Sequence, residues 1–167
     1  MIILGGNPMA SNGSVWTVPD FRNRVKDLQA RGGELVVIDP RRSETAKIAD
    51  RHIFVRPGSD AFLLIALLKT MKAMGLPAAA DYVRNVDALW DALEPFDVAD
   101  CLARANVPAE DVHHLATRML SGPAALYGRM GASTQSFGTL TTWLVAVANI
   151  VSGQLDREGG LLCGAPV

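Results

Sequence analysis

The stretch that decides the fold is VVIDPRRSETAKIADRHIFVRPGSD, residues 36–60. It holds two short apolar runs bounded by turn residues, a pattern typical of buried strands. Each run ends in a turn that carries an aspartate, Asp39 in the first and Asp60 in the second. The sequence therefore predicts two neighbouring strands, each followed by an acidic turn, with paired arginines in the first turn.

The rest of the chain alternates in the same way. We predict a first strand at 2–5, a helix that begins at Pro19 or Asp20, a helix that begins at Ser59 or Asp60, and a fourth strand at 123–128. Further helices are expected at 79–94, 97–105, 108–122 and 139–152, and loops at 9–20 and 129–138. Strands that alternate with helices predict an α/β protein, a three-layer α/β/α arrangement with a Rossmann-like, mainly parallel sheet and helices on both faces.

Length and composition limit the classes of protein. The 167 residues suit a single α/β domain over 1–167, with 77–107 as a candidate helical insertion. A net charge of −1 argues against general binding to nucleic acid, and the longest apolar segment, TTWLVAVANIVSG, is shorter than the ~20 residues of a membrane span. The two cysteines are too far apart in sequence for a C-x-x-C metal site.

The chain begins inside a predicted strand and stops in a glycine-rich segment. We therefore expect a fragment of a larger protein. No signal peptide is recognisable, and the compartment stays open between cytoplasm and periplasm.

Four turns follow the predicted strands, where open α/β sheets bind ligands. Glycines let backbone N–H groups approach phosphate, arginines contact phosphate oxygens, and a carboxylate accepts from two adjacent N–H groups. The turns comprise Gly5 to Pro8, Asp39 to Ser43, Pro57 to Asp60, and Gly128 to Gln135.

Simpler interpretations stay open. Gly-x-Asn-Pro can be an ordinary turn, Arg41 and Arg42 a solvated pair, and Asp60 a helix cap. Met130 can serve packing alone. The dinucleotide fingerprint G-x-G-x-x-G is absent after the first strand, which puts NAD behind other nucleotides.

Three blocks of sequence resemble the molybdopterin oxidoreductases, the dimethyl sulfoxide reductase family. They are ILGGNPMAS, the stretch from VVIDPRRSETAKIAD to HIFVRPGSDAFLLIALL, and YGRMGASTQSFGTLTTWLVAVANIVSGQLDREGG. Together they cover most of the chain, and 77–107 matches least. The resemblance implies a bis(molybdopterin guanine dinucleotide) cofactor with molybdenum or tungsten.

The resemblance also implies roles for individual positions. Gly6 and Asn7 would lie at the turn that approaches the cofactor. The ribose and phosphate would meet Asp39, Arg41, Arg42 and Ser43. Gly58 and Ser59 would hold the guanine together with Asp60, which would accept from its N–H edge. Met130 and Gln135 would lie near the pterin. The family often has glutamine four residues after the methionine, where this chain has Thr134, so the role lies open between Thr134 and Gln135.

The family's metal ligand, the iron–sulfur cysteines of many members and the closing barrel match no part of this chain. We therefore assign it no catalytic residue and no metal ligand, and expect it to be inactive alone. The expected partners are the remaining domains of the parent oxidoreductase and an electron-transfer subunit. The alternatives are a structural domain of a metal-free relative, such as the large iron–sulfur subunit of NADH dehydrogenase, or a stand-alone nucleotide-binding module.

Overall fold

Four short strands form one parallel sheet in the order β3-β2-β1-β4. They are β1 (Ile2–Leu4), β2 (Val36–Ile38), β3 (Arg51–Ile53) and β4 (Leu126–Gly128). The computed structural model describes residues 1–13, 17–78 and 83–162. Because all four strands run the same way, their carboxyl ends and the turns that follow them lie along one edge of the sheet.

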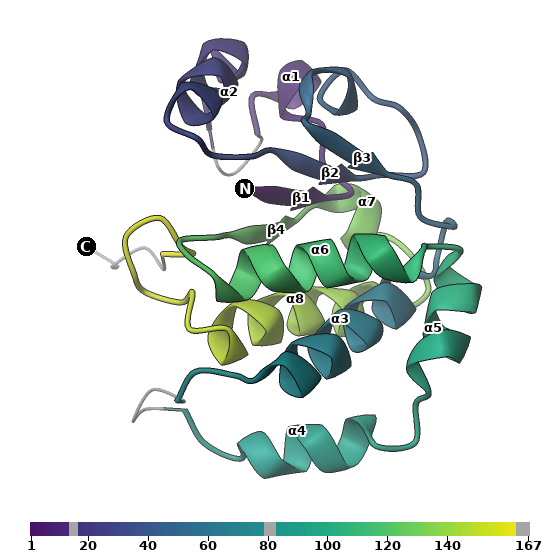
Figure 1. The fold of residues 1–167 in the computed structure, drawn as a ribbon. Helices are drawn as coiled ribbons and strands as arrows, with labels where there is room; N and C mark the ends of the chain where they lie inside the picture. The colour runs from purple at the N-terminus through teal and green to yellow at the C-terminus, as the bar shows by residue number, and fades with distance from the viewer. Residues whose placement is uncertain (14–16, 79–82, 163–167) are drawn as a thin grey trace.

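Helices cover both faces of this sheet, as predicted (Figure 1). In Figure 1, α1 and α2 lie above the sheet and α3, α6 and α8 lie below it. The bounds are α1 (Pro8–Ser11), α2 (Phe21–Ala30), the 3-10 helix η2 (Ala46–Ile48), α3 (Asp60–Met74), α4 (Val86–Leu93), α5 (Val98–Ala105), α6 (Ala109–Leu120), α7 (Met130–Ser133) and α8 (Gly138–Val151).

The two central strands, β1 and β2, are buried on both faces, which explains why they are apolar without alternation, while the edge strands β3 and β4 are partly exposed. Ile2 and Leu4 join the larger core, whose other members come mainly from α3, α5, α6 and α8. Ile3 points the other way, into a smaller core with Phe21 and Val25 of α2. The side-chain period of two along β1 thus serves both layers.

The outer edge of β4 is closed by side-chain amides. Asn149 of α8 accepts from the N–H of Leu126 (3.0 Å) and donates to its carbonyl oxygen (2.9 Å). Gln154 accepts from the N–H of Ala124 (3.1 Å). These side chains replace the hydrogen bonds that a further strand would make, so the edge strand leaves few free polar groups.

The differences from prediction are local. Residues predicted as loops contain two single-turn helices, α1 and α7. The predicted helix at 79–94 begins at Val86, and residues 79–82 lie outside the described residues. Ser59 takes the N-cap position of α3, so Asp60 is its first helical residue. Within the described ranges, no helix has both the length and the apolarity needed to cross a lipid bilayer.

Candidate functional site

The turns after β1 and β4 touch through their backbones. The N–H of Gly131 donates to the carbonyl oxygen of Gly5 (2.9 Å), and that of Arg129 to Leu4 (2.9 Å). Gly5 has φ +61, and a Cβ there would come within 2.5 Å of the backbone nitrogen of Ala132. Only glycine fits at this position, because both the backbone angle and the space exclude a side chain.

Asn7 ties the same turn to the loop after β2. Its Oδ1 accepts from the N–H and the hydroxyl of Thr45 (3.1 and 2.8 Å), and its Nδ2 donates to Glu44 (2.7 Å). This last bond is the main reason why the pKa of Glu44 is lowered, with a smaller effect from Arg41. The Asn7 side chain therefore joins the first two of the four turns at the carboxyl edge of the sheet, which we call the rim: residues 5–8, 39–43, 57–60 and 128–135.

In the loop after β2, Arg41 and Arg42 are exposed and Ser43 is buried. Asp39 accepts from the N–H of Arg41 (2.8 Å) and holds the turn. Arg41 is 66% exposed and lies 3.6 Å from Glu44, and Arg42 is exposed. Ser43 is fully buried, and its hydroxyl accepts from the N–H of Ala46 (3.3 Å). The arginines can thus reach a ligand from the loop, whereas the Ser43 hydroxyl serves the loop itself.

The turns after β3 and β4 meet through Asp60 and Gln135. The Nε2 of Gln135 donates to Oδ2 of Asp60 (2.7 Å), across 75 positions of sequence. Asp60 is only 5% exposed, and burial raises the pKa of its carboxyl. The hydrogen bond from Gln135 opposes this rise in pKa, and the charge of Asp39 adds to it. A buried carboxyl at the carboxyl edge of a parallel sheet is a typical feature of a binding site.

The side-chain amide of Gln135 is hydrogen-bonded through its nitrogen, and its oxygen is unpaired. Its Nε2 also donates to the carbonyl oxygen of Ala132 (2.9 Å), so the two acceptors around Nε2 fix which way the amide points. Its Oε1 is buried and has no hydrogen-bond partner among the described residues. Buried acceptors are nearly always satisfied, so this oxygen marks a site that another donor can complete.

Gly58 and Ser59 complete this corner. Gly58 has φ +81, and a Cβ on it would lie 3.7 Å from Oε1 of Gln135. Ser59 is buried, and its hydroxyl donates to the carbonyl oxygen of Arg56 (2.6 Å). Gly58 and Asp60, both predicted to hold the base, therefore lie against the same side chain, that of Gln135.

Gln135 and Thr134, the two candidates for the glutamine role, make different contacts. The Thr134 hydroxyl donates to the carbonyl oxygen of Met130 (2.6 Å), within α7, while Gln135 reaches Asp60. Met130 is 59% exposed at the start of α7. Gln135, expected near the pterin, thus lies beside the residue predicted to hold the base. The predicted turns included Gly5 and Gly131 without giving either a role of its own, whereas Glu44 and Thr45 lie just past the predicted turn and were missed.

The described residues hold no group of three or more histidine, cysteine or carboxylate side chains placed to bind a metal ion. Cys101 is buried in α5, which raises the pKa of its thiol. Cys163 lies outside the described residues.

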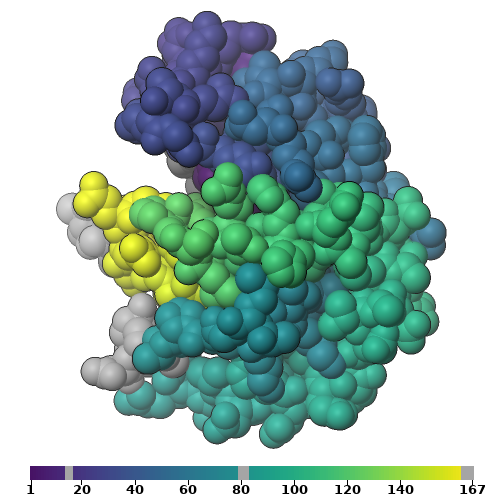
Figure 2. All heavy atoms as spheres, in the orientation of Figure 1, coloured from purple at the N-terminus to yellow at the C-terminus, as the bar shows by residue number. Residues whose placement is uncertain are grey.

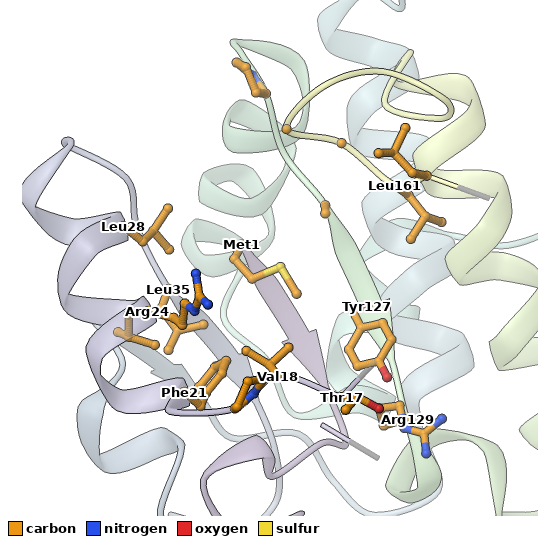
Figure 3. Close-up of a pocket in the computed structure, with 17 residues that line it drawn as sticks. Met1, Thr17, Val18, Phe21, Arg24, Leu28, Leu35, Tyr127, Arg129 and Leu161 are labelled. Atoms are coloured by element: carbon orange, nitrogen blue, oxygen red, sulfur yellow. The ribbon is translucent and has the colours of Figure 1, made fainter. Parts of the chain in front are cut away.

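A large cavity of about 930 Å³ lies on the α2 side of the sheet, beside Met1 and β4, and reaches the four turns only at Arg129. Figure 2 shows the recess between the purple-blue residues of α2 and the yellow C-terminal loop. Phe21, Leu28, Met1, Tyr127 and Leu161 line it (Figure 3). No predicted site residue is among its lining residues, and the cavity corresponds to sheet surface that α2 does not cover.

Comparison with known proteins identifies the family. No family model matches the chain. The chain is 32% identical over 132 residues to the assimilatory nitrate reductase of Haloferax mediterranei, which is 78% of this chain and 18% of the relative. It is 22% identical to the dimethyl sulfoxide/trimethylamine N-oxide reductase of Rhodobacter capsulatus, covering 96% of this chain and 21% of the relative.

A solved structure agrees in fold. Acetylene hydratase from Pelobacter acetylenicus superposes with a TM-score of 0.77 at 18% identity, over 96% of this chain and 22% of that one. The chain thus spans about a fifth of the length of the relatives it matches. With the three sequence blocks and the four-turn rim, these relationships show that the chain belongs to the molybdopterin oxidoreductase (dimethyl sulfoxide reductase) family.

Proposed function

We propose that this chain is the segment of a molybdenum or tungsten oxidoreductase that binds bis(molybdopterin guanine dinucleotide), and that its four-turn rim holds a guanine nucleotide portion. The observation that carries the proposal is the buried carboxylate of Asp60, hydrogen-bonded to Gln135 beside the Gly58 turn. Relatives that are reductases support the enzyme class.

The chemistry of this corner fits a guanine edge. Two adjacent N–H donors suit a carboxylate, which has two acceptor oxygens. Burial disfavours the charged form of Asp60, as its raised pKa indicates. Hydrogen-bond donors from a ligand would stabilise the charged carboxylate. The Asp60 carboxylate already accepts one N–H group, that of Gln135 at 2.7 Å, which shows that N–H donors reach it in this corner. A base that can only accept would bring no donor to this carboxylate.

The neighbouring turns fit the ribose and phosphates. Arg41 and Arg42 are exposed on the loop after β2 and can pair with phosphate oxygens. Asp39 shapes that loop, and Gly6 follows the close backbone approach at Gly5. Asn7, Ser43 and Ser59 use their side chains to hold the turns. Met130, exposed on α7, stays the residue proposed for the pterin side.

In the whole enzyme, the metal of the cofactor would supply two-electron or oxygen-atom transfer. The residues of this chain would bind and orient the nucleotide end of the cofactor. Because the chain spans about a fifth of its relatives, we propose that other domains of the enzyme supply the metal ligand, any iron–sulfur cluster and the contact with an electron-transfer subunit.

Nucleotide titration tests the proposal. Isothermal titration of the chain with GDP and with ADP should show GDP binding at least ~10-fold more tightly, since adenine lacks the paired donors. Asp60→Asn should abolish the preference, because an amide N–H then faces the donors of the base. Asp27→Asn, the same change at an exposed site on α2, is the matched control and should keep it. Equal affinities for GDP and ADP in the unaltered chain would count against the proposal and in favour of a structural role.

A further inference from the structure

The hydrogen bond from Gln135 occupies an acceptor oxygen of Asp60 that the proposed function requires for the base. Asp60 is 5% exposed, and its Oδ2 already receives the Nε2 of Gln135 at 2.7 Å. A ligand that needs both carboxylate oxygens therefore meets a donor already in place. Gln135 lies in the segment between α7 and α8, and its side chain is held by hydrogen bonds to Asp60 and to the carbonyl oxygen of Ala132.

The closed arrangement is incompletely satisfied. Gln135 pairs its two N–H groups with Asp60 and the carbonyl oxygen of Ala132, while its buried Oε1 has no partner among the described residues. Burying an unpaired acceptor disfavours the conformation that contains it. If the amide moved away from Asp60, Oε1 could accept a hydrogen bond from water or from another donor. The contact therefore satisfies the Asp60 carboxylate and leaves the Gln135 amide with one unpaired acceptor.

We propose that Gln135 is a displaceable gate on Asp60, a stand-in donor that a base with two adjacent N–H groups replaces. This inference rests on the proposed nucleotide-binding function and adds a selecting residue to it. A guanine-type edge supplies the donor that Gln135 withdraws and a second one for the other oxygen. An adenine-type edge offers an acceptor next to its amine, so it cannot replace Gln135 without setting a lone pair against the carboxylate.

The gate makes a prediction opposite to that of an ordinary contact residue. If Gln135 helped to hold the base, removing it would weaken binding. If it occupies the acceptor, removing it should strengthen binding of the base that fits and leave other bases unaffected. A side chain that only supports the fold would shift the affinities for both bases together, so the split between bases distinguishes the three roles.

The test compares GDP and ADP by isothermal titration of the 167-residue chain and its variants. Gln135→Ala should bind GDP about five-fold more tightly, on the scale of the net contribution of one hydrogen bond, and change ADP affinity less than about two-fold. Gln135→Met keeps the length without the donor and should show the same gain. Thr134→Ala should leave both affinities unchanged, because the Thr134 hydroxyl donates to the carbonyl oxygen of Met130, in the turn that precedes it.

The contrary outcomes are distinct. Weaker or unchanged GDP binding in Gln135→Ala would contradict the proposal that Gln135 is a gate. Equal gains in affinity for GDP and ADP would show that the side chain hinders both nucleotides by its size alone, which would also contradict it. A gain with alanine but not with methionine would likewise contradict displacement of a donor. These results differ from failure of the proposed function, in which the unaltered chain and all variants fail to prefer GDP and Asp60→Asn changes nothing.

Discussion

Gly131 donates its backbone N–H to the carbonyl oxygen of Gly5 at 2.9 Å, which puts the turn after β1 in direct backbone contact with the start of α7. The approach works only because neither residue has a Cβ: one on Gly131 would lie 2.9 Å from that oxygen, and one on Gly5 only 2.5 Å from Ala132. The first and last turns of the rim are therefore held together without side chains.

Gly5→Ala should destabilise the chain more than the same change at Gly32. Both glycines have positive φ, +61 and +78, but nothing lies within 4 Å of a Cβ on Gly32. Gly32→Ala thus measures backbone strain alone, ~1 kcal/mol, while Gly5→Ala adds a steric clash of a further ~1–3 kcal/mol. Urea unfolding of both variants gives the comparison, and equal losses would show that the contact with α7 yields easily.

Asn7→Ala should loosen the loop that carries Arg41 and Arg42. The change removes three hydrogen bonds to Thr45 and Glu44, and we expect a loss of ~2 kcal/mol in the free energy of unfolding. Glu44→Ala removes only the exposed partner and is the control, with an expected change under ~0.5 kcal/mol. Hydrogen exchange at the amides of 43–46 should speed up in Asn7→Ala and not in the control.

Asp60 should make stability depend on pH in an unusual direction for an acid. Its folded pKa is raised from 3.8, so between that value and the raised one the folded state binds more protons than the unfolded state. The contribution of this carboxyl is fully present below that window and is lost as pH rises through it. Asp60→Asn lacks this dependence.

The measurement is the unfolding free energy of the chain minus that of Asp60→Asn, followed from acid to neutral pH. This difference should fall as pH rises from about 4 and then level off. A difference that grows with pH would mean that the hydrogen bond from Gln135 outweighs burial.

Asn149→Ala should be among the most damaging single changes away from the rim. Asn149 pairs with both backbone groups of Leu126 and donates to Val145 (2.8 Å), all within the core. Leaving these groups unpaired should lower the unfolding free energy by ~3 kcal/mol or more. Thr142→Ala, on the exposed side of the same helix, should change it by under ~0.5 kcal/mol. Similar effects for the two variants would show that water replaces Asn149 at the strand edge.

The sequence predicts the architecture well because apolar runs and turn residues carry it directly. All four strands, the parallel sheet and the helices on both faces agree with prediction. The single-turn helices α1 and α7 were missed, since four residues give no periodicity to read. The start of α4 was placed too early because a run of alanines favours a helix by propensity, whereas Asn85, with a left-handed backbone, caps the helix that begins at Val86.

The site was predictable as a set of turns and not as a set of contacts. Parallel strands bring their carboxyl ends to one edge, so Asp39, Asp60 and Asn7 could be grouped. The bond from Gln135 to Asp60 depends on how the first turn of α3 meets the segment after α7, 75 positions further along the chain, which no local pattern specifies. For the same reason the inward role of Ser43, which the loop buries, could not be read from its neighbours.

Mapping GDP onto the chain by backbone amide chemical shifts tests the central claim most directly, because Arg129 alone among the residues that line the large cavity belongs to the four turns. The account predicts that the shifted amides cluster in four turns, at 5–7, 39–43, 58–60 and 130–135, and that Asp60→Asn removes these shifts. Shifts concentrated instead around Met1, Phe21 and Leu161, in the cavity beside α2, would contradict it.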